Sequence, residues 1–121
     1  MIISCIAIDD EPLALSKLES FIGKIPELKL MRTFRTAIDA LTYLREAKTD
    51  LIFLDIQMED MTGIEFLQTA GFEANIIITT AYENYALKGF ELNVTDYLLK
   101  PFSFSRFAQA VGKVLTIHSE K

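Results

Sequence analysis

Four acidic side chains lie next to strongly apolar stretches of this chain, where buried residues would be expected. Asp9, Asp10 and Glu11 directly follow the first apolar run, and Asp55 interrupts a later one. Crowded carboxylates repel one another, and a hard divalent cation such as Mg²⁺, which takes oxygen ligands, relieves that repulsion. If the two segments meet, the pattern predicts a magnesium site. A structural role at a helix N-terminus is the alternative for Asp10 and Glu11, because acids are favoured there in any case.

A hydroxyl and an amine occupy comparable places later in the chain. Thr80 closes an apolar run that starts at residue 75, and Lys100 closes one that starts at residue 94. Each has an ordinary explanation, because threonine is common in strands and a single lysine is usually a solvated surface charge. Independent surface positions would not place polar groups at the same end of successive apolar runs. We therefore interpret Thr80 and Lys100 as parts of one site with the acids.

The elements that must position these residues alternate regularly along the chain. Apolar β-rich runs are separated by segments of helical period, which predicts βαβ units, a parallel sheet and helices on both faces. The first helix should begin at Pro12, and capping boxes should open two others. The capping boxes pair Thr36 with Asp39 and Thr62 with Glu65. The fourth of five helices is expected around Ala86, Leu87 and Phe90. The strands are expected at 2–8, 28–34, 50–56, 75–81 and 94–99.

The expected fold class is therefore α/β, a doubly wound five-stranded parallel sheet of order 2-1-3-4-5 in a single domain over residues 1–121. In this order the first and third strands are neighbours, and ligands bind outside their carboxyl ends. Asp9, Asp10 and Asp55 should then converge on one crevice, because neighbouring strands lie only about 5 Å apart.

Composition limits the function classes. Half of the residues are hydrophobic, the apolar runs are too short to span a membrane, and the net charge of −5 disfavours direct binding to nucleic-acid phosphates. The single cysteine, Cys5, lies within an apolar run and cannot form an internal disulfide, so we expect a packed thiol and a cytoplasmic location. The single histidine, His118, is expected to be solvated at the end of the last helix.

Four segments together carry a resemblance to a known family. The chain resembles the receiver domain of two-component response regulators over essentially its whole length, which implies the flavodoxin-like (CheY-like) fold. Residues 80–91, together with residues 96–102, are similar to the receivers that precede LytTR-type (LytR/AlgR-like) DNA-binding domains. The matching segments are DD at 9–10, LIFLDIQM at 51–58, IIITTA at 76–81 and DYLLKPF at 96–102.

The resemblance implies a role for each residue of the site. Asp55 would accept a phosphoryl group from the phosphohistidine of a sensor histidine kinase. Asp10 and Asp55 would bind Mg²⁺ through their carboxylates, Gln57 through its backbone carbonyl and Asp9 through water. Lys100 would offset the charge of the phosphoryl oxygens, since phosphoryl transfer depends mainly on positioning and charge neutralisation. Such a domain modifies itself and is not a turnover enzyme acting on an external substrate.

The resemblance also implies a switch. Thr80 would turn toward the phosphoryl group, and the ring of Tyr97 would fill the space that it leaves; ordinary half-buried packing is the alternative for Tyr97. The surface of the fourth helix, fifth strand and fifth helix would then select partners, among them a second copy of the chain. DNA would be contacted only through an output domain, and no membrane contact is expected.

The sequence departs from the common receiver pattern in a few places. Glu59 replaces a frequent proline, which adds negative charge near the site. Gln57 and Tyr82 occupy positions that tune dephosphorylation in this family, and the bulk of Tyr82 predicts a phosphoryl lifetime longer than minutes. By resemblance, the Lys100-Pro101 peptide bond is expected to be cis.

Three other readings compete. A metal-dependent phosphatase with an aspartate nucleophile would need a second acid two residues after its first, where this chain has Glu11 after Asp9, and a substrate cap for which no residues remain. A nucleotide-binding protein of the same fold would need a glycine-rich loop after the first strand. A phosphorylation-independent interaction module remains the main alternative, although Thr80 and Lys100 are retained.

Overall fold

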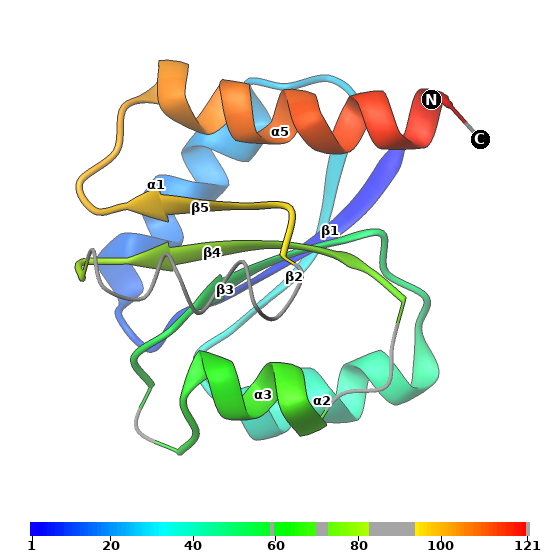
Figure 1. The fold of residues 1–121 in the computed structure, drawn as a ribbon. Helices are drawn as coiled ribbons and strands as arrows, with labels where there is room; N and C mark the ends of the chain where they lie inside the picture. The colour runs from blue at the N-terminus through cyan, green and yellow to red at the C-terminus, as the bar shows by residue number, and fades with distance from the viewer. Residues whose placement is uncertain (59, 70–72, 83–93, 121) are drawn as a thin grey trace.

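The computed structural model describes residues 1–58, 60–69, 73–82 and 94–120, and Glu59 and the helix expected around Ala86 lie outside them. Helices α1 and α5 cover one face of the sheet, and α2 and α3 cover the other (Figure 1). Three layers result, as the alternating pattern predicts. In chain order the elements are β1 (Ile3–Ile8), α1 (Pro12–Gly23), β2 (Leu28–Phe34), α2 (Ala37–Glu46), β3 (Leu51–Asp55), α3 (Gly63–Thr69), β4 (Asn75–Thr80), β5 (Asp96–Leu99) and α5 (Phe104–Ser119).

The sheet has the predicted order β2-β1-β3-β4-β5, and every neighbouring pair of strands is parallel. Its registers bring the carboxyl ends of the central strands level, since Ile8 pairs with Leu54 and Asp55 with Thr79. Residues that directly follow β1 therefore lie beside the end of β3. The pairing of β1 with the edge strand β2 has one irregularity: the register shifts between Cys5 and Ile6 of β1, which pair with Leu30 and Arg32 and pass over Met31.

Two apolar layers hold the helices against the sheet. Side chains of β1, β3, β4 and β5 alternate between the two faces, so each buried strand contributes to both layers. The layer under α1 and α5 contains the stacked rings of Phe53 and Phe107, and the layer under α2 and α3 contains Phe66. These layers fix the strand ends rigidly, which is the condition for a precise site on them.

The helix starts follow the predicted capping chemistry. The Thr36 side chain accepts a hydrogen bond from the Asp39 backbone N–H at the start of α2. At the start of α3, Thr62 and Glu65 form a complete capping box, in which each side chain accepts from the other residue's N–H. Pro12 occupies the first position of α1, as predicted.

The expectation for His118 was wrong, whereas those for Cys5 and for the proline peptide bond are confirmed. His118 is half-buried, and its Nε2 lies 3.2 Å from Oδ1 of Asn75 at the start of β4. Cys5 is fully buried, and burial raises the pKa of its thiol to about 12. The Lys100-Pro101 peptide bond is cis.

Candidate functional site

Asp9, Asp10 and Asp55 converge at the carboxyl ends of β1 and β3, as predicted. One carboxylate oxygen from each lies within 4.8 Å of the others. Asp9 and Asp55 are buried, and Asp10 is half-buried. The donor set consists of carboxylate oxygens held close together, which is the chemistry that Mg²⁺ prefers, so the residues present fit this cation.

Backbone hydrogen bonds hold the acids in place. The Asp9 N–H donates to the carbonyl of Phe34 at the end of β2, at 3.0 Å. The Asp9 Oδ1 accepts from the Glu11 N–H at 2.9 Å, and the Asp55 Oδ1 accepts from the Gln57 N–H at 3.3 Å. Each carboxylate is thus oriented by the chain that follows its own strand, before any ligand is considered.

Glycine is required where α3 begins, because the helix start lies against the backbone of Asp55. A Cβ atom on Gly63 would lie 2.8 Å from the Asp55 carbonyl oxygen and 2.8 Å from the Cα of Ile56. Neither atom can move without displacing the strand end that carries the carboxylate. The Gly63 N–H also donates to the Ile56 carbonyl at 2.7 Å, which closes the loop tightly over β3.

Lys100 reaches the acids from the end of β5. Its Nζ lies 2.8 Å from Oδ2 of Asp9 and 3.6 Å from Oδ1 of Asp55. Burial alone would lower the pKa of this amine, but the hydrogen bond to Asp9 and the charge of Asp55 outweigh burial and raise it. Lys100 is therefore charged at neutral pH, and it is the cation that balances these acids within the described part of the chain.

One lysine does not neutralise three carboxylates, and Asp55 carries the consequence. Burial raises the pKa of Asp55 to about 7, and the charges of Asp9 and Asp10 act in the same direction. Lys100 and the Gln57 N–H oppose this rise without cancelling it. A bound cation would relieve the repulsion and favour the ionised carboxylate.

The two predicted switch residues lie on β4 and β5. Thr80 is buried, and its hydroxyl accepts a hydrogen bond from the Tyr82 N–H at 3.0 Å. Its carbonyl accepts from the Lys100 N–H, so the ends of β4 and β5 are joined beside the acids. Tyr97 is half-buried and packs against the apolar layer under α2 and α3. The structure therefore places Thr80 at the site edge and Tyr97 on the neighbouring strand.

Comparison with known proteins decides the family. Residues 5–112 match the response regulator receiver domain. The chain belongs to this family. The receiver domain is 36% identical over 120 residues to an uncharacterized response regulatory protein of Vibrio cholerae serotype O1, covering 98% of this chain and 51% of that protein. It is 40% identical over 110 residues to the transcriptional regulatory protein LytR of Staphylococcus aureus strain N315, covering 88% of this chain and 45% of LytR.

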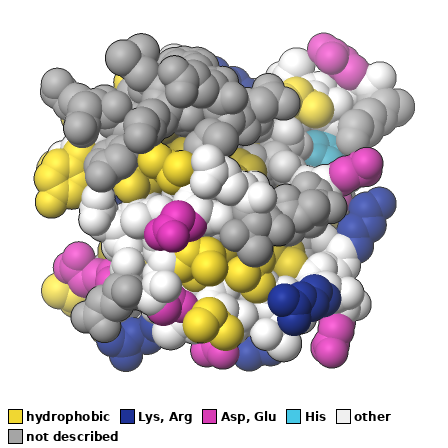
Figure 2. Space-filling view, turned by 60° about the horizontal axis from the view of Figure 1, so that its bottom comes forward, with side chains coloured by type: hydrophobic (Ala, Val, Ile, Leu, Met, Phe, Trp, Pro, Cys, Tyr) yellow, Lys and Arg dark blue, Asp and Glu magenta, His cyan; other side chains and the backbone are white. Residues whose placement is uncertain are grey.

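A solved structure agrees with this assignment. The response regulatory domain of protein mrkE from Klebsiella pneumoniae superimposes with a TM-score of 0.90 at 30% sequence identity, covering 98% of this chain and 99% of that one. The receiver domain spans about half the length of the curated relatives named above. Among the described residues, no helix is long and apolar enough to cross a membrane. On the face shown in Figure 2, Lys and Arg side chains stand singly rather than as a continuous basic patch.

Sequence reasoning missed two features on the strands β4 and β5. Asp96, at the start of β5, is buried and forms a two-bond ion pair with Arg106, with distances of 2.9 and 3.0 Å. Arg106 also donates to the carbonyl of Tyr97 at 3.0 Å, which ties α5 to the predicted switch strand. The second feature is Thr79, whose buried hydroxyl has no hydrogen-bond partner among the described residues. The separation of ten residues between Asp96 and Arg106 gave no periodic signal.

Proposed function

We propose that this receiver domain accepts a phosphoryl group on Asp55 from the phosphohistidine of a sensor histidine kinase, in a reaction that requires Mg²⁺. One observation carries the proposal: the buried Asp55 carboxylate lies 3.6 Å from the Lys100 ammonium and within 4.8 Å of oxygens from Asp9 and Asp10. A nucleophile, a cation and a set of oxygens suited to a metal ion are thus available together at the carboxyl ends of the strands.

Each residue has a distinct part in the proposed reaction. Asp10 and Asp55 would hold Mg²⁺ through carboxylates, Gln57 through its carbonyl and Asp9 through water; the bound cation supplies charge neutralisation for the phosphoryl oxygens. The ionised Asp55 oxygen attacks phosphorus in line with the leaving group. Lys100, whose pKa is raised, remains charged and offsets the negative charge that the phosphoryl group brings.

The proposed switch uses the hydroxyl of Thr80. A phosphoryl group on Asp55 offers new acceptor oxygens, and Thr80 can exchange its present contact with the Tyr82 N–H for a bond to one of them. The Tyr97 ring would follow into the space released. The altered surface would include β5 and α5, together with the helix expected around Ala86, and would select the partner or a second copy of the chain.

We further propose that the signal reaches DNA through a LytTR-type output domain that is separate from residues 1–121. Similarity to proteins named as LytR transcriptional regulators supports this, as does the acidic net charge of −5, which disfavours direct contact of the receiver with phosphates. We therefore propose a cytoplasmic regulator that modifies itself and turns over no external substrate.

The proposal is tested by intact mass after incubation with phosphoramidate, with and without Mg²⁺. We expect the wild type to gain one phosphoryl group only with Mg²⁺, and Asp55→Asn to gain none. Asp39→Asn, an exposed acid on α2, serves as the matched control and should behave as the wild type. We also expect the label to persist for longer than minutes, as Tyr82 predicts; loss within seconds would contradict that part.

No label on a folded wild-type protein would favour the alternative, an interaction module that works without phosphorylation. That alternative predicts that Asp55→Asn binds partners as well as the wild type does. The proposed function predicts a difference between the two, because only the wild type can be switched.

A further inference from the structure

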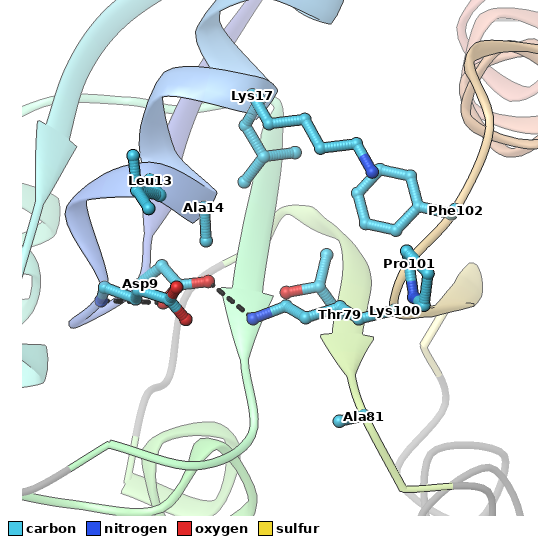
Figure 3. A pocket seen from close by; sticks show the side chains of 11 residues that line it. Asp9, Leu13, Ala14, Lys17, Thr79, Ala81, Lys100, Pro101 and Phe102 are labelled. Carbon is cyan, nitrogen blue, oxygen red and sulfur yellow. Dashed lines mark hydrogen bonds and ion pairs between the residues drawn. The ribbon is translucent and has the colours of Figure 1, made fainter.

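A cavity of about 480 Å³ lies beside the acid site, between α1 and the chain that follows β4 and β5 (Figure 3). Its volume lies within the range of roughly 300–1,000 Å³ that is typical of small-molecule sites. Leu13, Ala14 and Leu18 line it from α1, and Phe102 lines it from the opposite side. We call this cavity the α1 cavity and these apolar side chains the α1 cavity wall.

The cavity and the acid site share two residues. Asp9 and Lys100 line the cavity, and the same Lys100 Nζ that contacts Asp9 at 2.8 Å lies 3.6 Å from the Asp55 carboxylate. In Figure 3 the Lys100 side chain crosses the floor of the cavity toward Asp9. A molecule whose apolar part rests on the α1 cavity wall can therefore place a second group next to Asp55.

The polar groups of the cavity indicate what that molecule must carry. Both Asp9 carboxylate oxygens already accept hydrogen bonds, from the Glu11 N–H and from Lys100. Thr79 also lines the cavity, but the residue is only 1% exposed and its hydroxyl is shielded, so a ligand would meet the exposed Glu11 carboxylate and the lysines instead. Lys17 adds a cation at the rim, 4.6 Å from the centre of the Phe102 ring. The Lys100 ammonium has three N–H donors and uses one on Asp9, so a ligand beside Asp55 should offer acceptor oxygens to the others.

We propose that the α1 cavity binds the acyl group of a small acyl phosphate, and that it makes branched apolar acyl phosphates better phosphoryl donors than acetyl phosphate. This inference rests on the proposed function of Asp55. An Asp55 oxygen forms a bond to phosphorus, the bond between phosphorus and the acyl oxygen breaks, and its electron pair leaves with the carboxylate. The products are aspartyl phosphate and the free carboxylate, so no further reactant is needed.

The expected preference follows from the apolar surface that a larger acyl group would bury. An isovaleryl group has three more carbons than an acetyl group. One methylene in an apolar pocket changes specificity by roughly 10-fold or more when it is fully enclosed. Because this cavity is partly open to solvent, we expect about a tenfold preference for the larger donor over acetyl phosphate.

The experiment compares initial rates of phosphorylation of the full chain by acetyl phosphate and isovaleryl phosphate, in Mg²⁺, followed by intact mass. The two donors release carboxylic acids of similar acidity, so their intrinsic reactivities are matched. Ala14→Phe should fill the cavity and remove the preference, because it should slow labelling by isovaleryl phosphate more than labelling by acetyl phosphate. Ser16→Phe is the control, because it adds the same ring at an exposed α1 position outside the cavity.

The outcomes separate this inference from the proposed function. Faster labelling by isovaleryl phosphate, lost in Ala14→Phe and kept in Ser16→Phe, supports the inference. Equal rates for both donors, or a preference that survives Ala14→Phe, overturn it while leaving Asp55 as phosphoacceptor. Failure of both donors and of phosphoramidate to label the folded protein overturns the proposed function together with the inference.

Discussion

Two buried aspartates with lysine or arginine partners differ sharply in their electrostatics. Asp55 at the end of β3 is 5% exposed, and Asp96 at the start of β5 is 4% exposed. Burial raises the pKa of Asp55 to about 7. Burial also acts to raise the pKa of Asp96, but hydrogen bonds from Arg106, the Tyr97 N–H and Lys113 outweigh it and lower that pKa.

The number of cations and acids around each carboxylate explains the difference. Asp96 accepts from Arg106 at 2.9 and 3.0 Å and lies 3.1 Å from Lys113. Asp55 instead shares Lys100 with Asp9, which lies closer to the amine. The comparison teaches that burial alone does not mark a functional carboxylate. A cluster left short of positive charge is where a ligand can be bound, whereas a compensated ion pair holds the fold together.

The largest effect on stability is expected at Asp96, the carboxylate whose charge is balanced by its cations. Asp96→Asn removes the charge that Arg106 and Lys113 share, and we expect the free energy of unfolding to fall by about 2–3 kcal/mol. Urea unfolding at pH 7 measures this value, with Glu19→Gln at an exposed position within α1 as control. A loss below about 0.5 kcal/mol, the level of an ordinary surface substitution, would show that the ion pair does not anchor α5 to β5.

The same substitution at Asp55 should change the free energy of unfolding in the opposite direction. Asp55→Asn removes one of three repelling charges while Lys100 keeps its contact with Asp9. We expect the free energy of unfolding at pH 7, without Mg²⁺, to rise by about 1–2 kcal/mol, well below what the full shift in pKa would give. A decrease would mean that Lys100 compensates the acids more fully than the distances indicate.

The effect of Mg²⁺ on stability should be smaller, and it should depend on the acid cluster and not on Asp96. At a concentration ten times its dissociation constant, Mg²⁺ should raise the free energy of unfolding of the wild type by about 1.4 kcal/mol. Asp96→Asn should gain the same increment, because its substitution is outside the acid cluster. Asp10→Asn should gain less at equal Mg²⁺. An equal gain in Asp10→Asn, measured by thermal or urea unfolding, would place the cation elsewhere.

The strand order and the acid cluster could be predicted from the sequence because they depend on local patterns. Apolar runs of strand length alternate with helical segments, and a polar residue lies at or beside the end of each run. In a parallel sheet those ends meet at one edge, so the convergence of Asp9, Asp10 and Asp55 follows from connectivity alone. The capping box of α3 is equally local and was predicted correctly, whereas at the start of α2 the structure shows only the Thr36 half of the predicted box.

Features that depend on how distant elements pack could not be predicted. His118 was expected in solvent, but the packing of α5 brings its ring to Asn75 of β4, 43 residues away in sequence. The bulge in the edge strand leaves both Met31 and Arg32 exposed, which breaks the alternation that the sequence pattern suggests. Strand limits were also set one or two residues too wide, as at 94–99, where β5 begins at Asp96.

The positions of individual side chains in the site also depend on how distant elements pack, so they could not be predicted from the sequence either. The sequence placed Lys100 at the site but could not show that its amine lies nearer to Asp9 than to Asp55, because the side chain has four rotatable bonds. Likewise, Thr79 and Thr80 are adjacent in sequence, and only their alternation across β4 places Thr79 in the α1 cavity.

The smallest expected effect is a difference in pH dependence between the two aspartates. Asp55 has its pKa raised in the folded state to about 7 from 3.8, so the folded protein binds more protons than the unfolded one between these values. Its contribution to stability is therefore present below about pH 4 and is lost as pH rises toward 7. Asp96 has a lowered pKa, so its contribution is present above about pH 4 and is lost only as pH falls below it.

Between pH 5 and 7, without Mg²⁺, the two variants should thus follow different courses. The stability gap between Asp55→Asn and the wild type should widen by less than about 1 kcal/mol as pH rises, and then level off above 7. The gap between Asp96→Asn and the wild type should stay constant, because Asp96 is ionised in both states across this window. Urea unfolding at three pH values measures both gaps. A constant gap for Asp55→Asn would mean that its carboxylate is already compensated, and the contrast between the two regions would then rest on geometry alone.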